Sequence, residues 1–259
     1  MKKGQPAMTI SPEFSPLAAW LAAPLVAYLL LLAPWLGKRS YDRLVRRRDG
    51  DPRALVRMFR SWIAESWGLM VVALALAAIS PGVGLADLGL VMPSGGGSWV
   101  TGMVVGATIG LVIVTLVLRS RAKSGRDIPG QAAFSAMLPR TTAERWAAAA
   151  MAVTAGICEE VLYRGFLIAL GVGVLGLDVK VAAGAALIIF VAGHWYQGWK
   201  GLLMVTLAGC GLTALYLAQG SLLLPIVVHA LMDLRGLLFV PAPERPAGAD
   251  TGAVEPVRG

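Results

Sequence analysis

Seven stretches of the sequence are apolar for long enough to cross a lipid bilayer, and this feature limits the possible folds more than any other. A transmembrane helix needs roughly 20 such residues, because the hydrocarbon core is ~30 Å thick and each helical residue advances about 1.5 Å. Backbone polar groups must also be satisfied inside the membrane, which favours helices. The sequence therefore predicts an all-α polytopic membrane protein with a bundle of about seven transmembrane helices, six or eight being the alternatives. The apolar runs are residues 17–36, 62–80, 99–118, 146–171, 180–196, 202–219 and 221–240.

The composition excludes an ordinary soluble domain and sets the expected orientation. Of the 259 residues, 57% are hydrophobic and 15% are charged. The formal net charge of +8 is concentrated in two segments, 38–60 and 119–145, so nucleic acid is not an expected partner. Short loops rich in Lys and Arg face the cytoplasm. We therefore expect these segments and the C-terminus to be cytoplasmic, and the stretch 81–98, which has no Lys or Arg, to lie on the opposite side.

The two ends of the chain differ in character. The run 17–36 is followed by basic residues instead of a small-residue cleavage site, which predicts a retained helix rather than a removed signal peptide. Residues 241–259 are rich in Pro, Gly and charge, which predicts a disordered tail. Before the tail, the chain divides into N-terminal transmembrane helices with basic cytoplasmic loops at 1–140 and a core at 141–240.

The fourth apolar run carries the motif EEVLYR at residues 159–164. Thr141 and Glu144 are spaced as a capping box and predict the start of this helix. A charge deep in hydrocarbon costs roughly 2.5 to 3.5 kcal/mol, so the motif needs an explanation. Glu160 and Arg164 are four residues apart and can pair on one helical face, whereas Glu159 lies about 100° away from Glu160 around the helix. A poorly solvated carboxylate of this kind suits a general base.

The chain has two histidines, and each belongs to a similar four-residue step. Phe190 and His194 form one pair, in FVAGH, and His229 and Asp233 form the other, in HALMD. Polar residues on one face of three apolar helices make sense if those faces meet in a shared, partly wet cavity between the later helices. Activation of water needs such a cavity, with a base for the proton and donors for a developing oxyanion.

Each motif taken alone also has a structural interpretation. The two glutamates and the arginine could form a buried salt bridge or the ion site of a transporter. His194 precedes Trp195 and other aromatic residues and could belong to an interfacial aromatic belt. His229 and Asp233 could be a hydrogen-bonded pair inside the bundle. The combination favours a functional site, because three independent structural coincidences would otherwise be needed.

The three motifs together resemble those of a known family. EEVLYR, FVAGH and HALMD are similar, in this order, to the EExxxR, FxxxH and HxxxN/D motifs of the CAAX protease and bacteriocin-processing (CPBP, or Abi) family of intramembrane endopeptidases. The resemblance covers about residues 141–240. It implies that this region is the catalytic core of a hydrolase that cleaves peptide bonds.

The resemblance also implies a role for each matched residue. Glu159 would be the general base that activates water, and His194 would position that water or share its proton. His229 and Asp233 would polarise the scissile carbonyl and stabilise the oxyanion. Asp233 stands where CAAX endopeptidases usually carry Asn, and it can donate a hydrogen bond only when protonated, so orientation of His229 is its alternative role. The supporting residues would be Glu160, Arg164 and Phe190.

The resemblance further implies the setting of the reaction. The substrate would be a membrane-associated protein or peptide, and the reaction CAAX-type C-terminal processing, peptide maturation or immunity, in a bacterial cytoplasmic membrane. No cofactor or metal is expected, although this family has been labelled as metalloproteases. The metal-dependent alternative is a zinc site at Glu159, His194 and His229, without the HExxH motif.

Two other functions stay open from the sequence. One is a membrane scaffold or partner-binding protein that keeps the polar residues as a structural network. The other is a proton-coupled transporter with Glu159 as the carrier, although no internal repeat is evident.

Overall fold

The protein is a helical bundle. The computed structural model describes residues 8–93, 97–124 and 134–239, and the predicted tail at 241–259 lies outside them. Within these ranges all named elements are helical and none is a strand. The elements are α1 (Pro16–Ala27), η1 (Tyr28–Leu32), α2 (Ala33–Arg47), α3 (Ala54–Ala78), α4 (Gly97–Lys123), η2 (Ser135–Met137), α6 (Thr142–Glu159), η3 (Glu160–Leu167), α7 (Ile168–Leu175), α8 (Val179–Gly193), η4 (Trp195–Gln197), α9 (Gly198–Gln219) and α10 (Leu223–Leu238).

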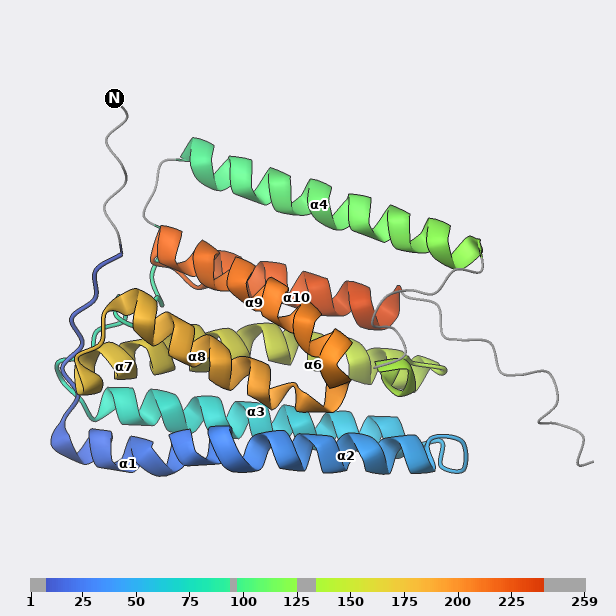
Figure 1. The fold of residues 1–259 in the computed structure, drawn as a ribbon, viewed down its shortest axis with the longest axis horizontal. Helices are drawn as coiled ribbons and strands as arrows, with labels where there is room; N and C mark the ends of the chain where they lie inside the picture. Colours follow the sequence, from blue (N-terminus) through green and yellow to red (C-terminus); the bar gives the residue numbers. More distant parts are fainter. Residues whose placement is uncertain (1–7, 94–96, 125–133, 240–259) are drawn as a thin grey trace, which may run out of the picture.

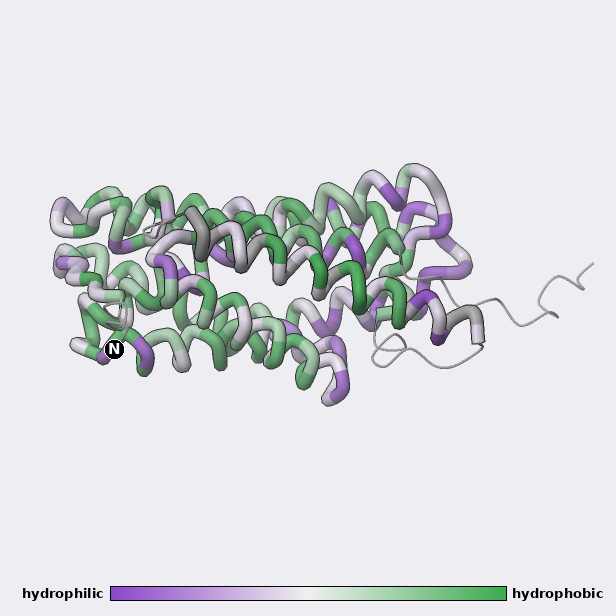
Figure 2. The backbone as a smooth tube through the Cα atoms, turned by 90° about the horizontal axis from the view of Figure 1, so that it is seen from above, coloured by the Kyte–Doolittle hydropathy of each residue, from purple (hydrophilic) through white to green (hydrophobic). Residues whose placement is uncertain are grey.

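The helices run roughly parallel to one another along the long axis of the molecule (Figure 1). The α1–α2 run forms one side of the bundle and α4 the opposite side, with the remaining helices between them. Apolar residues fill the middle of the bundle, and hydrophilic residues gather most densely at one end (Figure 2). This distribution is the one expected of a protein embedded in a membrane.

Over the residues that the structure describes, three helical runs are long and apolar enough to cross a membrane by themselves, namely Pro16–Arg47, Ala54–Ala78 and Trp195–Gln219. Helix α8 is apolar but has 15 residues, fewer than a full crossing requires when the helix stands upright. The seven crossings expected from the apolar runs therefore stay a prediction in their number, while the helical membrane bundle is confirmed.

One boundary differs from the expectation. The segment 38–60 was expected as a loop, but its first ten residues continue the first helix as the end of α2, because Lys and Arg are good helix formers. Tyr41 and Leu44 face inward and are buried, while Arg43 and Arg47 are exposed, so this part of α2 is amphipathic.

A buried ion pair joins the residue after α2 to the first turn of α6. Arg48, after α2, donates from Nη1 and Nη2 to both oxygens of Glu144 at 2.6 and 2.9 Å. Its other donors reach the carbonyl oxygens of Ala136 and Leu138 at 2.9 and 3.1 Å. Glu144 also completes the predicted capping box with Thr141, which confirms the predicted start of the fourth helix. The pair thus ties the end of the first helical run to the start of α6.

The run α6–η3–α7 lies at the centre of the bundle. Every residue from Glu160 to Gly171 is buried. Helix α6 crosses α10 closely: a Cβ atom on Gly156 would lie 2.8 Å from both the backbone nitrogen and the Cβ of Ala230. Because Gly156 is one helical turn before Glu160 and Ala230 adjoins His229, this crossing brings two of the predicted motifs together.

Replacement of Arg48 by Met should destabilise the protein. The Glu144 side chain is 1% exposed and would lose its charge partner, at a cost of about 3 to 5 kcal/mol in the free energy of unfolding. The thermal midpoint of the detergent-solubilised protein, followed by tryptophan fluorescence, measures the change. The control is Arg140→Met, since Arg140 pairs with the exposed Asp49 and should contribute only about 0 to 1 kcal/mol. Equal losses in the two variants would contradict this assignment.

Candidate active site

The EEVLYR motif spans a change in helix type. Glu159 is the last residue of α6, and Glu160 is the first residue of the π-helix η3. π-helical turns are rare and occur frequently at functional sites, because the wider turn redirects the side chains that follow. No residue pattern in this segment predicts the π-helical turn. Glu159 and Glu160 therefore leave the same central helix in different directions, as the helical spacing had predicted.

Glu160 and Arg164 form the predicted ion pair inside the bundle. Arg164 Nη1 donates to Glu160 Oε1 at 2.9 Å, and the two side chains are 2% and 0% exposed. Further donors of Arg164 reach Thr213 Oγ1 and the carbonyl oxygen of Gly209 on α9, both at 3.4 Å. The guanidinium also lies 4.3 Å from the centre of the Phe190 ring. Arg164 thus links η3 to α8 and α9.

His229, on α10, is held by the same carboxylate. Its Nδ1 lies 2.7 Å from Glu160 Oε1. Glu160 is ionised when it pairs with the permanently charged Arg164, and a carboxylate can only accept, so Nδ1 carries the hydrogen and donates. The other ring nitrogen, Nε2, faces Glu159 and Asp233. Glu160 therefore orients His229, a role that the sequence had left to Asp233 as an alternative.

His194 lies directly after the end of α8, as its C-cap, and not within the helix expected over 180–196. Its Nδ1 is 2.8 Å from the carbonyl oxygen of Phe190. A carbonyl can only accept, so this nitrogen also carries its hydrogen and Nε2 is directed elsewhere. The Phe190 ring packs between the two histidines, with centroid distances of 4.6 Å to His194 and 6.2 Å to His229. Phe190 thus positions both imidazoles.

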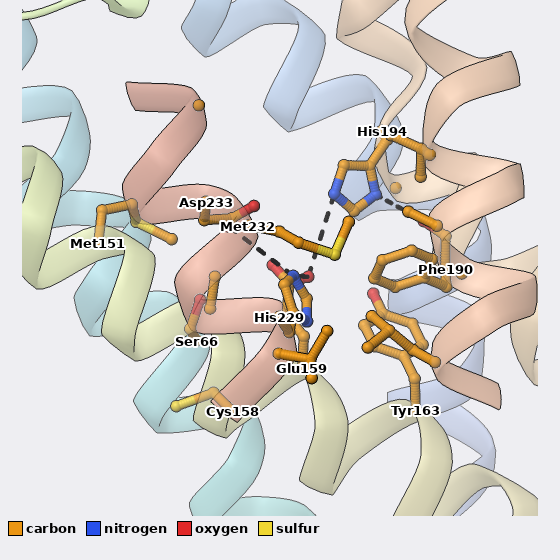
Figure 3. A pocket seen from close by; sticks show the side chains of 18 of the residues that line it. Ser66, Met151, Cys158, Glu159, Tyr163, Phe190, His194, His229, Met232 and Asp233 are labelled. Carbon is orange, nitrogen blue, oxygen red and sulfur yellow. Dashed lines mark hydrogen bonds and ion pairs between the residues drawn. The ribbon is translucent and has the colours of Figure 1, made fainter. Parts of the chain in front are cut away.

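Glu159 faces both histidines. Its Oε2 lies 3.8 Å from His229 Nε2 and 4.0 Å from His194 Nε2 (Figure 3). This oxygen is buried and has no hydrogen-bond partner among the described residues. Asp233 Oδ2 lies 3.7 Å from His229 Nε2, and its side chain is 40% exposed. The four residues predicted to act in catalysis therefore meet in one place, although they come from α6, α10 and the end of α8.

A cavity of about 950 Å³ adjoins these residues. Its wall includes Glu159, His194, His229 and Asp233, and it is otherwise mainly apolar. Parts of α3, α4, α9 and α10 contribute to it. A volume of this size suits a peptide segment or an apolar chain. The polar groups are thus placed at the wall of a space that can hold a substrate.

The residues do not match a zinc site. Two ligands of a tetrahedral zinc lie roughly 3.3 Å apart, because each bond is about 2.0 to 2.2 Å long. The imidazole nitrogens lie 3.8 and 4.0 Å from Glu159 Oε2. Over the part of the chain that the structure describes, no group of three or more His, Cys, Asp and Glu side chains is arranged to hold a metal ion.

Sequence reasoning missed several residues around the site. Thr213 and Gly209 on α9 accept hydrogen bonds from Arg164. The only sign of this contact in the sequence is that two small residues lie four positions apart, on one face of a helix. Tyr163 lies inside the motif, lines the cavity and packs against Phe190 at 5.2 Å. Tyr196 stacks on His194 at 6.1 Å. The two tyrosines contact the polar residues through ring packing. Such contacts cannot be recognised from the pattern of charged residues in the sequence.

The comparison with protein families agrees with the motifs. A family model described as type II CAAX prenyl endopeptidase Rce1-like matches residues 141–235. The match begins at the capping residue Thr141 and includes all three motifs. No curated protein and no solved structure matches the chain. The resemblance to CAAX proteases drawn from the motifs is thereby confirmed.

Neutral amides at positions 159 and 160 should have different effects on stability. Glu160→Gln leaves the buried Arg164 without its charge partner and should lower the free energy of unfolding by about 3 kcal/mol or more. Glu159→Gln removes no direct hydrogen bond and should change it by less than about 1 kcal/mol. Thermal unfolding of both purified variants in the same detergent provides the comparison. Similar midpoints for the two variants would show that the glutamates do not have separate roles.

Proposed function

We propose, from the motifs and from the family model that matches residues 141–235, that this membrane protein is a CAAX-type (CPBP) protease. It would hydrolyse a peptide bond of a membrane-associated protein or peptide, using water activated by Glu159. The observation that carries the proposal is the position of Glu159 Oε2, which faces Nε2 of both histidines in the cavity wall. The forms proposed for this reaction are CAAX-type C-terminal processing and peptide maturation or immunity.

Glu159 is proposed to take the proton of the attacking water. Its separations of 3.8 and 4.0 Å from the imidazole nitrogens are too long for direct hydrogen bonds but suit a water molecule that bridges them. A neutral His194, with its hydrogen fixed on Nδ1, presents Nε2 as an acceptor for the same water. The water would then be held by two acceptors, and its lone pair would be free to attack a carbonyl carbon.

His229 is proposed to stabilise the oxyanion. With Nδ1 donating to Glu160, a protonated His229 has one remaining donor, Nε2, which is directed toward the cavity. Asp233 lies 3.7 Å from this nitrogen and can steady the imidazolium by charge, or donate itself when protonated. After the carbon–nitrogen bond breaks, the proton taken by Glu159 passes to the leaving amine, so the base returns to its starting state.

The proposed setting is a bacterial cytoplasmic membrane with the arginine-rich end of the bundle on the cytoplasmic side. The C-terminal end of α2, which carries Arg43 and Arg47, lies at this end (Figure 1). Arg48 follows it directly, and Arg140 pairs with the neighbouring Asp49. The catalytic residues belong to the later helices, and the C-terminus of α10 points to the same end. A substrate anchored in the membrane would present its peptide segment to the cavity from within the bilayer.

Loss of the base or of the proposed oxyanion donor should abolish cleavage. Glu159→Gln and His229→Ala should each lower kcat by about 10²-fold to 10⁴-fold, because each removes a group that acts in the transition state. The assay uses protein reconstituted in liposomes, with membrane-anchored peptides that carry either a prenylated C-terminal cysteine motif or an acyl anchor. Cys210→Ala, at an exposed cysteine of α9, serves as the control and should keep wild-type activity. Full activity of Glu159→Gln would refute the proposal.

A further inference from the structure

A second carboxylate lines the cavity and has no part in the mechanism above. Glu65 lies near the middle of α3, a helix apolar enough to cross the membrane. Its Oε1 accepts a hydrogen bond of 2.5 Å from the hydroxyl of Tyr28. Tyr28 is the first residue of η1, a π-helical turn that interrupts the first helical run. An ionisable residue at this depth is expensive to keep, and such residues usually serve a function.

Glu65 lines the same cavity as the proposed catalytic residues. Tyr163 lines the wall of the same cavity. Tyr163 lies one residue before Arg164 in η3, and its hydroxyl is directed toward the end of α8, 3.5 Å from the position of a Cβ on Gly193. Glu65, Tyr163 and Glu159 therefore belong to the wall of one cavity.

The charges on the cavity wall favour a cationic ligand. Among the described lining residues, three carry carboxylates, namely Glu65, Glu159 and Asp233. The positive groups are Arg235 and His229, the latter when protonated as in the proposed mechanism, so the carboxylates still outnumber the cations. One hydrogen bond from a neutral tyrosine compensates little of the cost of placing a carboxylate in an apolar wall. An ammonium or guanidinium group that enters the cavity would supply the missing charge, and in this poorly solvated site the pairing would be stronger than in water.

We propose that Glu65, held in place by Tyr28, binds a lysine or arginine side chain of the peptide substrate close to the cleaved bond. The inference rests on the proposed peptidase function and adds a determinant of substrate selectivity. Glu65 is then a specificity residue, and the Tyr28 hydroxyl fixes the direction of its carboxylate. A purely structural hydrogen bond between the first helical run and α3 would make stability, but not selectivity, depend on Glu65.

Selectivity measurements separate these two roles. The probes are membrane-anchored, internally quenched peptides that carry Lys, norleucine or Glu at one position at a time, from three residues before to three residues after the cleaved bond. The wild-type protein should cleave a Lys peptide with a higher kcat/KM than its norleucine counterpart for at least one position. Glu65→Gln should lower this ratio about tenfold or more, because it removes one partner of a poorly solvated charge pair. The norleucine peptides should be cleaved as by the wild type.

Three further variants test whether the charge of Glu65 determines the preference for Lys. Glu65→Asp retains the charge and should restore much of the preference for Lys, while Tyr28→Phe should weaken it. Glu13→Gln removes an exposed carboxylate shortly before α1, a helix that begins at the end of the bundle opposite to the end of α2 (Figure 1), and it should leave the ratio unchanged.

The outcomes distinguish the two levels of the proposal. Cleavage with the same Lys-to-norleucine ratio in wild type and Glu65→Gln, or a preference for the Glu peptides, would overturn the role of Glu65 alone. Absence of cleavage of every peptide by the wild type, under conditions where Glu159→Gln behaves identically, would overturn the peptidase function and this inference with it.

Discussion

The arrangement of the site depends on one carboxylate oxygen that two partners share. Glu160 Oε1 accepts from Arg164 at 2.9 Å and from His229 at 2.7 Å. The first contact makes the buried charge tolerable, and the second fixes which nitrogen of His229 carries hydrogen. Because Nδ1 is occupied in this way, Nε2 is presented to Glu159. Glu160, the carboxylate of a buried salt bridge, therefore determines which nitrogen of His229 faces Glu159.

Close helix packing makes this sharing possible. Gly156 lets α10 approach α6 until Ala230 fills the space of an absent side chain, one turn from the Glu160–His229 contact. On the other side, a Cβ on Gly209 would lie 3.4 Å from Arg164 Nη2, so the small residue leaves room for the guanidinium beside α9. In a membrane, where apolar side chains gain little by leaving lipid, such close contacts supply much of the association between helices.

The helices, the Glu160–Arg164 ion pair and the family motifs could be predicted from the sequence, because each depends on the spacing of residues along one segment. The apolar runs indicate the helices, the step from Glu160 to Arg164 indicates the ion pair, and the three motifs indicate the family. The contact between Glu160 and His229 could not be predicted, since 69 residues separate them and helix spacing places them only on separate elements. The π-helix leaves no composition signal, and the pairing of Tyr28 with Glu65 depends on how the first helical run packs against α3.

The two histidines allow a direct test of the hydrogen-bond assignment. Nitrogen-15 NMR of protein labelled only at histidine reports His194 and His229 alone, and distinguishes a ring nitrogen that carries hydrogen from one that does not. We predict that Nδ1 carries hydrogen in both residues, and that Glu160→Gln changes the Nδ1 signal of His229 but not that of His194. A His229 with an unprotonated Nδ1, or one whose signal is unaffected by Glu160→Gln, would contradict it.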